Sequence, residues 1–444
     1  MFEPFDFSVV LGPDETVWVS AVSRAGAVHA VPRGGAVYAV PGEIGAVPTL
    51  GELEDLTDDF LDAIAYARPQ PAADLGAALR NLLFGEPEIL GLFHHARGVA
   101  ANEGRQLLVR LLAAPRSLAS VPWELTLDPD GGLHQFLCLA PYAHLVRSAR
   151  SRTYPDRVER VVPPLNLLIV LSSPIISERG DEFTFDLFEE KRNLLAELQP
   201  LEDSGLLNID VEEHPTLENL RRRVGGRRYG YHLVHYVGHA VQRGLLLEDR
   251  FGRSRMVEAE ILNELLRLCP NLRLVLFAGC ETARAPDLDV APADSAAADW
   301  RVRLSTADRC VRDSCPMVIG MQAVLPFRTE WLFTRCFYQA VTTGYSVAEA
   351  VRLARVTIRD DEHVGGSRLD WAVPSLIVGG GQPDVLVEPI AAAPARALRR
   401  GCARDELKLD LVESDLDFFS RLVPLRLAVD VLTGSTHDLS LIHI

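Results

Sequence analysis

Residues 231–240 read YHLVHYVGHA, and residues 272–280 read LRLVLFAGC. Both stretches are short runs of β-branched, aromatic and other apolar residues, which is typical of buried strands. Each run ends in a glycine that is followed by a reactive side chain, His239 in the first and Cys280 in the second. Between them, VEAEILNELLRL (257–268) has the apolar spacing of a helix. This order predicts two parallel strands connected by a crossover helix.

The same alternation of strands and helices extends outward on both sides of this unit. Further predicted strands are NLLIVLS (166–172), NIDVEE (208–213), PMVIGM (316–321) and VPSLIV (373–378), with LLLED (245–249) as a candidate short strand. Predicted helices are FEEKRNLLAELQPL (188–201), TLENLRRRV (216–224), TEWLFTRCFYQAVTTG (329–344) and SVAEAVRLARVTIRD (346–360). We therefore predict an α/β fold with a mostly parallel sheet flanked by helices, in which ligand sites lie beyond the carboxyl ends of the strands.

The two ends of the chain differ from this central part. Residues 1–90 contain valine- and glycine-rich stretches such as 17–31 and 34–42, then helical patterns at 55–67 and 75–83. They predict a smaller N-terminal β-rich, mixed subdomain, either separate from the following domain or part of it. Residues 386–438 are interpreted as a linker and the start of a truncated C-terminal region. The final LSLIHI (439–444) matches the translation of a transposase end sequence used in sequencing libraries, so we expect an artefact there rather than a chance apolar tail.

Composition and charge exclude several classes of protein. The chain has 444 residues, a net charge of −16 and 48% hydrophobic residues, so we expect a folded, acidic protein without a nucleic-acid or membrane partner. The basic cluster RRRVGGRR (221–228) fits a solvated helix end better than a phosphate-binding patch. No secretory signal is evident at the N-terminus, and the apolar runs are far shorter than the ~20 residues of a membrane span. Together with seven irregularly spaced cysteines, these features predict a cytoplasmic protein with reduced thiols.

The chemistry of the chain centres on the two residues that follow glycine. A thiol becomes a strong nucleophile when a neighbouring base takes its proton, and histidine titrates near neutral pH. Because Cys280 and His239 each follow a predicted parallel strand, we expect them at the same edge of the sheet. Taken singly, each residue is more often structural, as a core thiol or a packed histidine. The other central cysteines (Cys310, Cys315 and Cys336) lack zinc-ligand spacing, and we expect no metal.

Several motifs together indicate a family. YHLVHYVGHA and LVLFAGCETA resemble the histidine and cysteine motifs of CHAT domains, which are relatives of caspases and separases. Further similar stretches follow in the family's order: RQLLVRLLAAPRSLASVPWELTLDP (105–129), PMVIGMQ (316–322), FYQAVTTGYSVAEAVRLAR (337–355) and DWAVPSLIVGG (370–380). The resemblance begins near Gly91, and we place the CHAT domain at residues 91–385.

The resemblance implies a caspase-like fold and a cysteine endopeptidase that needs no cofactor. Cys280 would be the nucleophile and His239 its general base, and the backbone N–H groups of Ala240 and Cys280 would form the oxyanion hole. Gly238 and His235 could support the site, although His235 fits a packed strand residue better. The implied partners are a protein substrate and a sensor or regulatory protein or a fused C-terminal domain. Such an enzyme would act in a bacterial stress or anti-phage response.

Some positions depart from the family pattern, and they leave an alternative open. Ala240 stands where the family has glycine. Phe327 lies near the position where the family has an acidic residue thought to bind a basic substrate side chain, and this chain has no acid there before Glu330. A catalytically weak or inactive scaffold that mediates protein–protein interaction is therefore the alternative. A nucleotide-binding regulator is disfavoured because the phosphate-binding glycine motifs are absent. The Ala-, Pro- and Asp-rich stretch 283–299 predicts a mobile loop after the nucleophile.

Overall fold

A computed structural model describes most of the chain up to Glu388. It covers residues 2–388 except 12–16, 34–49, 67–69, 115, 132–134, 150–157, 175–186, 227–229, 242–243, 280–281, 285–303, 362–368 and 381–382. Of the segments predicted above, the second N-terminal stretch (34–42), most of the loop 283–299 and everything beyond residue 388 lie outside the described residues. Cys280 lies outside them as well.

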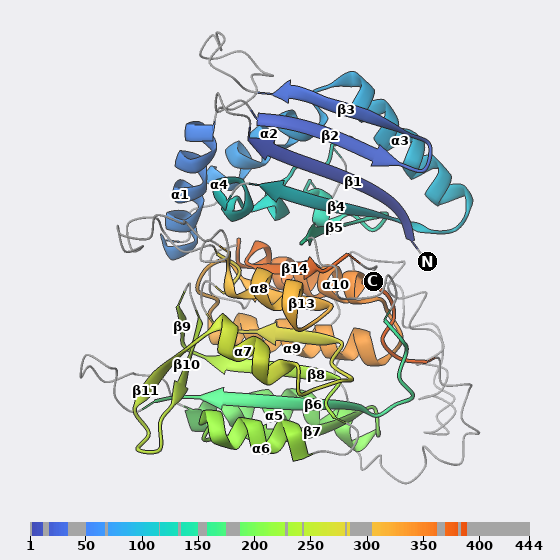
Figure 1. Cartoon of the computed structure of the whole chain (residues 1–444). Helices are drawn as coiled ribbons and strands as arrows, with labels where there is room; N and C mark the ends of the chain where they lie inside the picture. Colours follow the sequence, from blue (N-terminus) through green and yellow to red (C-terminus); the bar gives the residue numbers. More distant parts are fainter. Residues whose placement is uncertain are drawn as a thin grey trace.

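A single large sheet runs through the molecule (Figure 1). Its strand order is β3-β2-β1-β4-β5-β14-β13-β12-β8-β6-β7. In chain order the strands are β1 (Phe2–Leu11), β2 (Val17–Ser23), β3 (Gly26–Arg33), β4 (Gln106–Ala114), β5 (Ala143–Ser148), β6 (Leu165–Ser172), β7 (Leu207–Glu212), β8 (Leu233–Gly238), β12 (Leu274–Phe277), β13 (Met317–Met321) and β14 (Pro374–Val378).

The sheet is mostly parallel, which confirms the predicted fold class. Among the described strands of this large sheet, antiparallel pairing is confined to β1–β2, β2–β3 and β13–β14. The central strands β7, β6, β8, β12 and β13 are all parallel to their neighbours in that order. Their carboxyl ends therefore meet at one edge of the sheet, where ligand sites of α/β folds are found.

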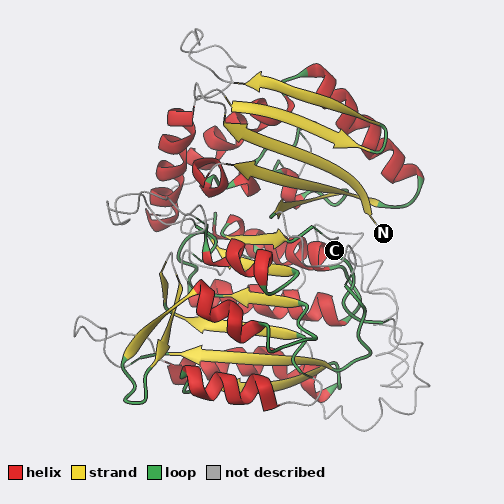
Figure 2. Ribbon diagram, viewed as in Figure 1, coloured by secondary structure: helices red, strands yellow, loops and turns green. Residues whose placement is uncertain are grey.

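Helices cover both faces of the sheet (Figure 2). The described α-helices are α1 (Leu50–Tyr66), α2 (Gln70–Phe84), α3 (Pro87–Asn102), α4 (Arg116–Ser120), α5 (Leu187–Asp203), α6 (Leu217–Gly226), α7 (Ala259–Leu266), α8 (Thr306–Asp313), α9 (Phe327–Thr342) and α10 (Val347–Asp360). Single 3-10 turns occur at η1 (Trp123–Leu125), η2 (Leu137–Leu139) and η5 (Asp370–Ala372).

Strand side chains alternate between two buried clusters, which explains the continuous apolar runs in the sequence. In β8, Leu233 and Val237 pack in the cluster that contains α5, α9 and α10, whereas Val234 and Tyr236 pack in the cluster that contains α6, α7 and α8. Both faces of a central strand are thus covered, so both sets of alternate positions must be apolar. His235 is the polar exception in this strand.

The N-terminal strands belong to the same sheet as the rest of the chain. β5 pairs in parallel with β14, with Arg147 beside Ile377 and Ser148 beside Val378. This pairing joins β1–β5 to the strands that follow residue 165. The edge of β14 that would otherwise be open is covered by the chain itself, which removes an exposed template for strand pairing.

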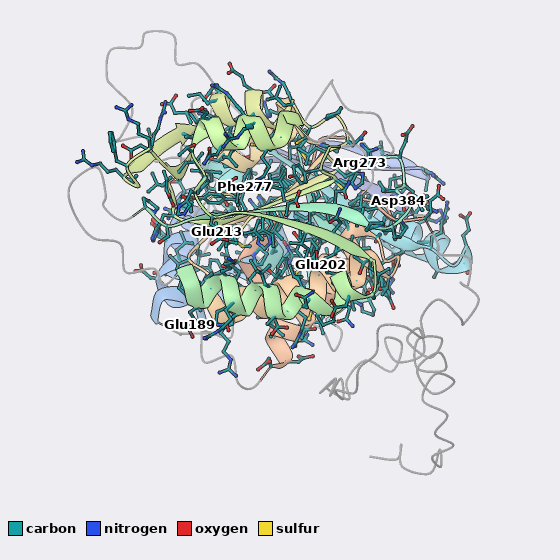
Figure 3. All side chains as sticks on the ribbon, turned by 90° about the horizontal axis from the view of Figure 1, so that it is seen from below. Glu189, Glu202, Glu213, Arg273, Phe277 and Asp384 are labelled. Carbon is teal, nitrogen blue, oxygen red and sulfur yellow. The ribbon has the colours of Figure 1, made fainter. Side chains whose placement is uncertain are left out.

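A second, three-stranded antiparallel sheet stands at the carboxyl edge of the central strands. It consists of β9 (Ala240–Val241), β10 (Gly244–Glu248) and β11 (Ser254–Glu258), in the order β11-β10-β9. Figure 3 shows the molecule from below. The labelled Arg273 and Phe277 mark the start and the end of β12, and the labelled Glu213 directly follows β7. The candidate LLLED strand is β10, in this small sheet rather than the large one.

Candidate active site

His239 lies at the carboxyl end of β8, directly before β9. Its side chain is half-buried, and this burial lowers the pKa of His239 below its ordinary value of 6.5. A lowered pKa keeps the imidazole neutral at physiological pH. A neutral imidazole can accept a proton, as a general base must.

The cysteine motif lies directly against the histidine motif. In the parallel pairing of β8 with β12, Phe277 lies beside Tyr236. Cys280 comes three residues after Phe277, and His239 comes three residues after Tyr236. Gly279 follows β12, and a Cβ atom placed on it would lie 2.7 Å from the Ala240 Cβ and 3.0 Å from the Gly238 carbonyl oxygen. The main chain that enters Cys280 therefore touches the residues on both sides of His239. Only glycine permits this approach.

The chain after Cys280 is anchored again within two residues. The Thr282 hydroxyl is buried, lies 3.1 Å from the Gly279 carbonyl oxygen to which it donates, and accepts a hydrogen bond from the Met321 N–H. Ala283 is also buried, and its N–H donates to the Met321 carbonyl at 2.9 Å. The predicted mobile loop was wrong at its first residue, because Ala283 is fixed to β13. Residues 285–299 of that loop lie outside the described residues.

Ala240 takes a strand conformation in β9 and pairs with Leu245 of β10. Because the Leu246 N–H donates to the His239 carbonyl at 3.0 Å, Ala240 and Leu245 form a non-hydrogen-bonded pair, and the Ala240 N–H points away from β10. Among the described residues, Gln135 alone is a non-glycine residue with positive φ. The alanine that replaces the family's glycine is thus free of backbone strain.

Gly238 has φ +155°, and a Cβ atom there would lie 2.5 Å from the Ser172 carbonyl oxygen. The lack of a side chain at Gly238 therefore allows the ends of β6 and β8 to lie close together. His235 is fully buried, and burial lowers its pKa to about 3. Its Nε2 lies 3.9 Å from Glu330 Oε1, and its ring centroid is 5.9 Å from that of Tyr338. His235 is a neutral interior side chain of β8, packed against α9.

The segment between β13 and α9 borders this edge of the sheet. Its exposed residues include Val324 (62% exposed) and, at the start of α9, Phe327 (46% exposed) and the basic Arg328. Glu330 is only 2% exposed, and burial raises its pKa well above the ordinary value. An acidic side chain is therefore not presented to solvent at the positions from Val324 to Glu330.

In the part of the chain that the structure describes, no three His, Cys, Asp or Glu side chains are grouped so that they could hold a metal ion. Cys310 and Cys315 are buried free thiols whose pKa values are raised by burial, and Cys336 is half-buried. None of the helices within the described ranges is long and apolar enough to cross a membrane.

Sequence reasoning proposed His239, Cys280 and Gly238 as site residues but did not single out three further residues that lie around them. These are Ser172, Tyr236 and Thr282, whose hydroxyl groups form hydrogen bonds with main-chain groups next to the site. Tyr236 carried a usable signal, since a phenol inside a buried strand requires a partner for its hydroxyl.

Several solved structures are similar to the chain. The chain is similar to Porphyromonas gingivalis RgpB (10% identity, TM-score 0.42, covering 68% of this chain and 70% of that one). It is similar to separase in the Saccharomyces cerevisiae separase–securin complex (11% identity, TM-score 0.45, covering 85% of this chain and 30% of that one). It is also similar to the Drosophila initiator caspase Dronc (13% identity, TM-score 0.31, covering 56% and 99%).

No curated protein sequence matches the chain. The sequence model of the CHAT domain matches residues 73–379, which is well over half of the chain and includes both motifs. This chain therefore belongs to the CHAT domain family.

Proposed function

We propose that this protein is a cysteine endopeptidase that uses Cys280 as nucleophile and His239 as general base. The observation that carries the proposal is the contact of Gly279 with Gly238 and Ala240, the residues on either side of His239. A contact this close between the two motifs is what a nucleophile and its base require, since they must come within hydrogen-bonding reach.

In the proposed reaction, the Cys280 thiol transfers its proton to His239 and attacks the carbonyl carbon of the scissile peptide bond. Negative charge then develops on the carbonyl oxygen, where the N–H groups of Ala240 and Cys280 would stabilise it. The direction of the Ala240 N–H, away from β10, favours this role. His239 returns its proton to the leaving amine, and water hydrolyses the resulting thioester.

Burial of His239 adapts it to this cycle. Since its pKa is lowered, the imidazole begins the cycle as a base, and the protonated form is acidic enough to donate readily to the leaving amine. The physiological substrate would be a protein. We propose a separate sensor or regulatory protein as the source of the activating signal, in keeping with a role in bacterial defence.

The proposal is tested by cleavage of a peptide library derived from a bacterial proteome, with mass spectrometry of newly formed amino termini. The wild-type protein should produce a reproducible set of new termini, and Cys280→Ala and His239→Ala should each produce none. Both losses should be near complete, because nucleophile and base act as one unit. Cleavage by Cys280→Ala at the wild-type sites would assign the nucleophile elsewhere, and the scaffold alternative predicts no cleavage by any of the three proteins.

A further inference from the structure

The main chain around His239 is held by two buried hydroxyl groups. The Tyr236 hydroxyl lies 2.6 Å from the His239 carbonyl oxygen and 2.8 Å from the Leu246 carbonyl oxygen. The Ser172 hydroxyl lies 2.6 Å from the same Leu246 carbonyl oxygen. Tyr236 is 2% exposed and Ser172 is fully buried, so neither bond competes with bulk water.

Each of the two hydroxyl groups can donate to only one carbonyl oxygen. Tyr236 and Ser172 each carry one O–H hydrogen, and two carbonyl oxygens face them. Ser172 reaches only the Leu246 carbonyl, so the Tyr236 hydrogen is left for His239. The His239 carbonyl also accepts from the Leu246 N–H at 3.0 Å, which engages both of its lone pairs. The peptide group that follows the imidazole-bearing residue is thereby fixed in place.

Tyr236 contacts the cysteine motif as well. A Cβ atom on Gly279 would lie 3.3 Å from Tyr236 Cε1, and a Cβ atom on Gly238 would lie 2.9 Å from the Tyr236 hydroxyl. The phenol therefore lies against both motif glycines at once. Its neighbours on this face of the sheet are apolar, including Val234 and Val275, so a phenylalanine would fill the same space. The hydroxyl is needed only for its hydrogen bond.

We infer that Tyr236 is a positioning residue for the proposed dyad: its hydroxyl fixes the main chain of His239 while its ring sets the distance to the cysteine motif. The inference rests on the proposed function, because it assigns to Tyr236 the geometry on which transfer of the Cys280 proton depends. Reacting groups displaced by about 1 Å can lose on the order of a hundredfold in rate.

The test is the pH dependence of Cys280 alkylation by iodoacetamide, measured on the full-length protein by mass spectrometry of the Cys280 peptide. This readout needs no substrate and separates Cys280 from the other thiols. In wild type, pairing with His239 should place the midpoint below ~8.5, the value of an isolated thiol. In Tyr236→Phe the midpoint should rise toward that value, and the rate at pH 7 should fall roughly tenfold.

Tyr231→Phe is the matched control. Tyr231 is also buried, and its hydroxyl donates to Asp210 at 2.7 Å, outside the contacts that surround His239. It should lose similar thermal stability and keep the wild-type midpoint. Ser172→Ala is the second test variant: the Tyr236 hydrogen is then shared by two carbonyls, so the midpoint should rise in the same direction by a smaller amount.

The outcomes separate the inference from the proposed function. If His239→Ala raises the midpoint but Tyr236→Phe and Ser172→Ala keep the wild-type profile, the dyad stands and the positioning role of Tyr236 is overturned. An equal shift in Tyr231→Phe would also overturn it, since any loss of packing would then suffice. If His239→Ala itself leaves the profile unchanged, both the dyad and the positioning role fail.

Discussion

Replacement of Glu124 by glutamine should destabilise the protein more than any exposed charge substitution. Glu124 is 2% exposed and lies in η1, within the PWEL stretch. Its carboxylate accepts hydrogen bonds from Arg147 Nε at 3.1 Å and Nη2 at 2.7 Å, from Ser375 at 2.7 Å and from Gln322 at 2.8 Å. Arg355 lies 3.8 Å away. The residue thus joins η1 and β5 to β14, α10 and the segment after β13.

All the groups around this carboxylate are donors, which decides the effect of Glu124→Gln. The new amide N–H2 would face groups that now donate, of which the Ser375 hydroxyl can turn to accept but Arg147 cannot. The two buried guanidinium groups of Arg147 and Arg355 also lose their shared negative charge. Removal of one partner from a buried ion pair costs roughly 3–5 kcal/mol. With an unfolding entropy near 2.1 cal/mol/K per residue, the 444 residues convert this into a melting temperature lower by roughly 3–5 °C.

Differential scanning calorimetry at pH 7 provides the measurement, with Glu189→Gln as the control. The Glu189 side chain is 57% exposed and lies 3.9 Å from Arg192, so its loss should cost less than ~0.5 kcal/mol and move the melting temperature by less than ~1 °C. If Glu124→Gln melts within 1 °C of the control, Glu124 does not hold these elements together and the reasoning is refuted.

Three further predictions concern pH and packing. Gly279→Ala should abolish peptide cleavage and Cys280 alkylation while the sheet still forms, because the new Cβ would lie 2.7 Å from the Ala240 Cβ. Alkylation of this variant at the wild-type rate would show that the two motifs are not in such close contact. Burial raises the pKa of Glu190 to about 7, so the contribution of this residue to stability should be highest below pH ~4.5 and fall as pH rises toward 7. Glu190→Gln should remove this part of the pH dependence in chemical denaturation. Burial alone would raise the pKa of Glu124, but the neighbouring arginines lower it. The stabilisation that Glu124 provides should therefore persist above pH ~4.5 and be lost only in stronger acid. If the melting temperature of Glu124→Gln stays equally far below that of the wild type down to pH 2, this prediction is wrong.

Much of the fold could be predicted from the sequence because the central strands are covered on both faces. Continuous apolar runs such as LRLVLFA then identify the strands, and the helices between them show one apolar stripe. Which strands pair is a different matter, since pairing depends on contacts between distant segments. The antiparallel placement of β14 and its pairing with β5 leave no local pattern, and the same holds for the separate sheet of β9–β11.

The candidate site, like the fold, could be predicted from the sequence only in part. His239 and Cys280, each after a glycine at the end of an apolar strand, were candidates from position and chemistry, and the resemblance to CHAT domains favoured a catalytic role over a structural one. The supports of the site could not be found in this way, because Ser172 and Thr282 are small hydroxyl residues whose partners are main-chain groups of distant strands. The effect of Ala240 was also beyond sequence reasoning, because its backbone conformation is set by pairing with β10.

The central claim is that the fold brings Cys280 and His239 together as a catalytic pair. The measurement that tests it most directly is the distance between Cys280 Sγ and the nearer ring nitrogen of His239 in a crystal structure in which residues 279–284 are resolved. We predict a distance of roughly 3–4 Å, with allowance for a longer contact in the resting enzyme. A separation well beyond ~7 Å, with the two side chains directed apart and no loop whose movement could close the gap, would contradict the claim.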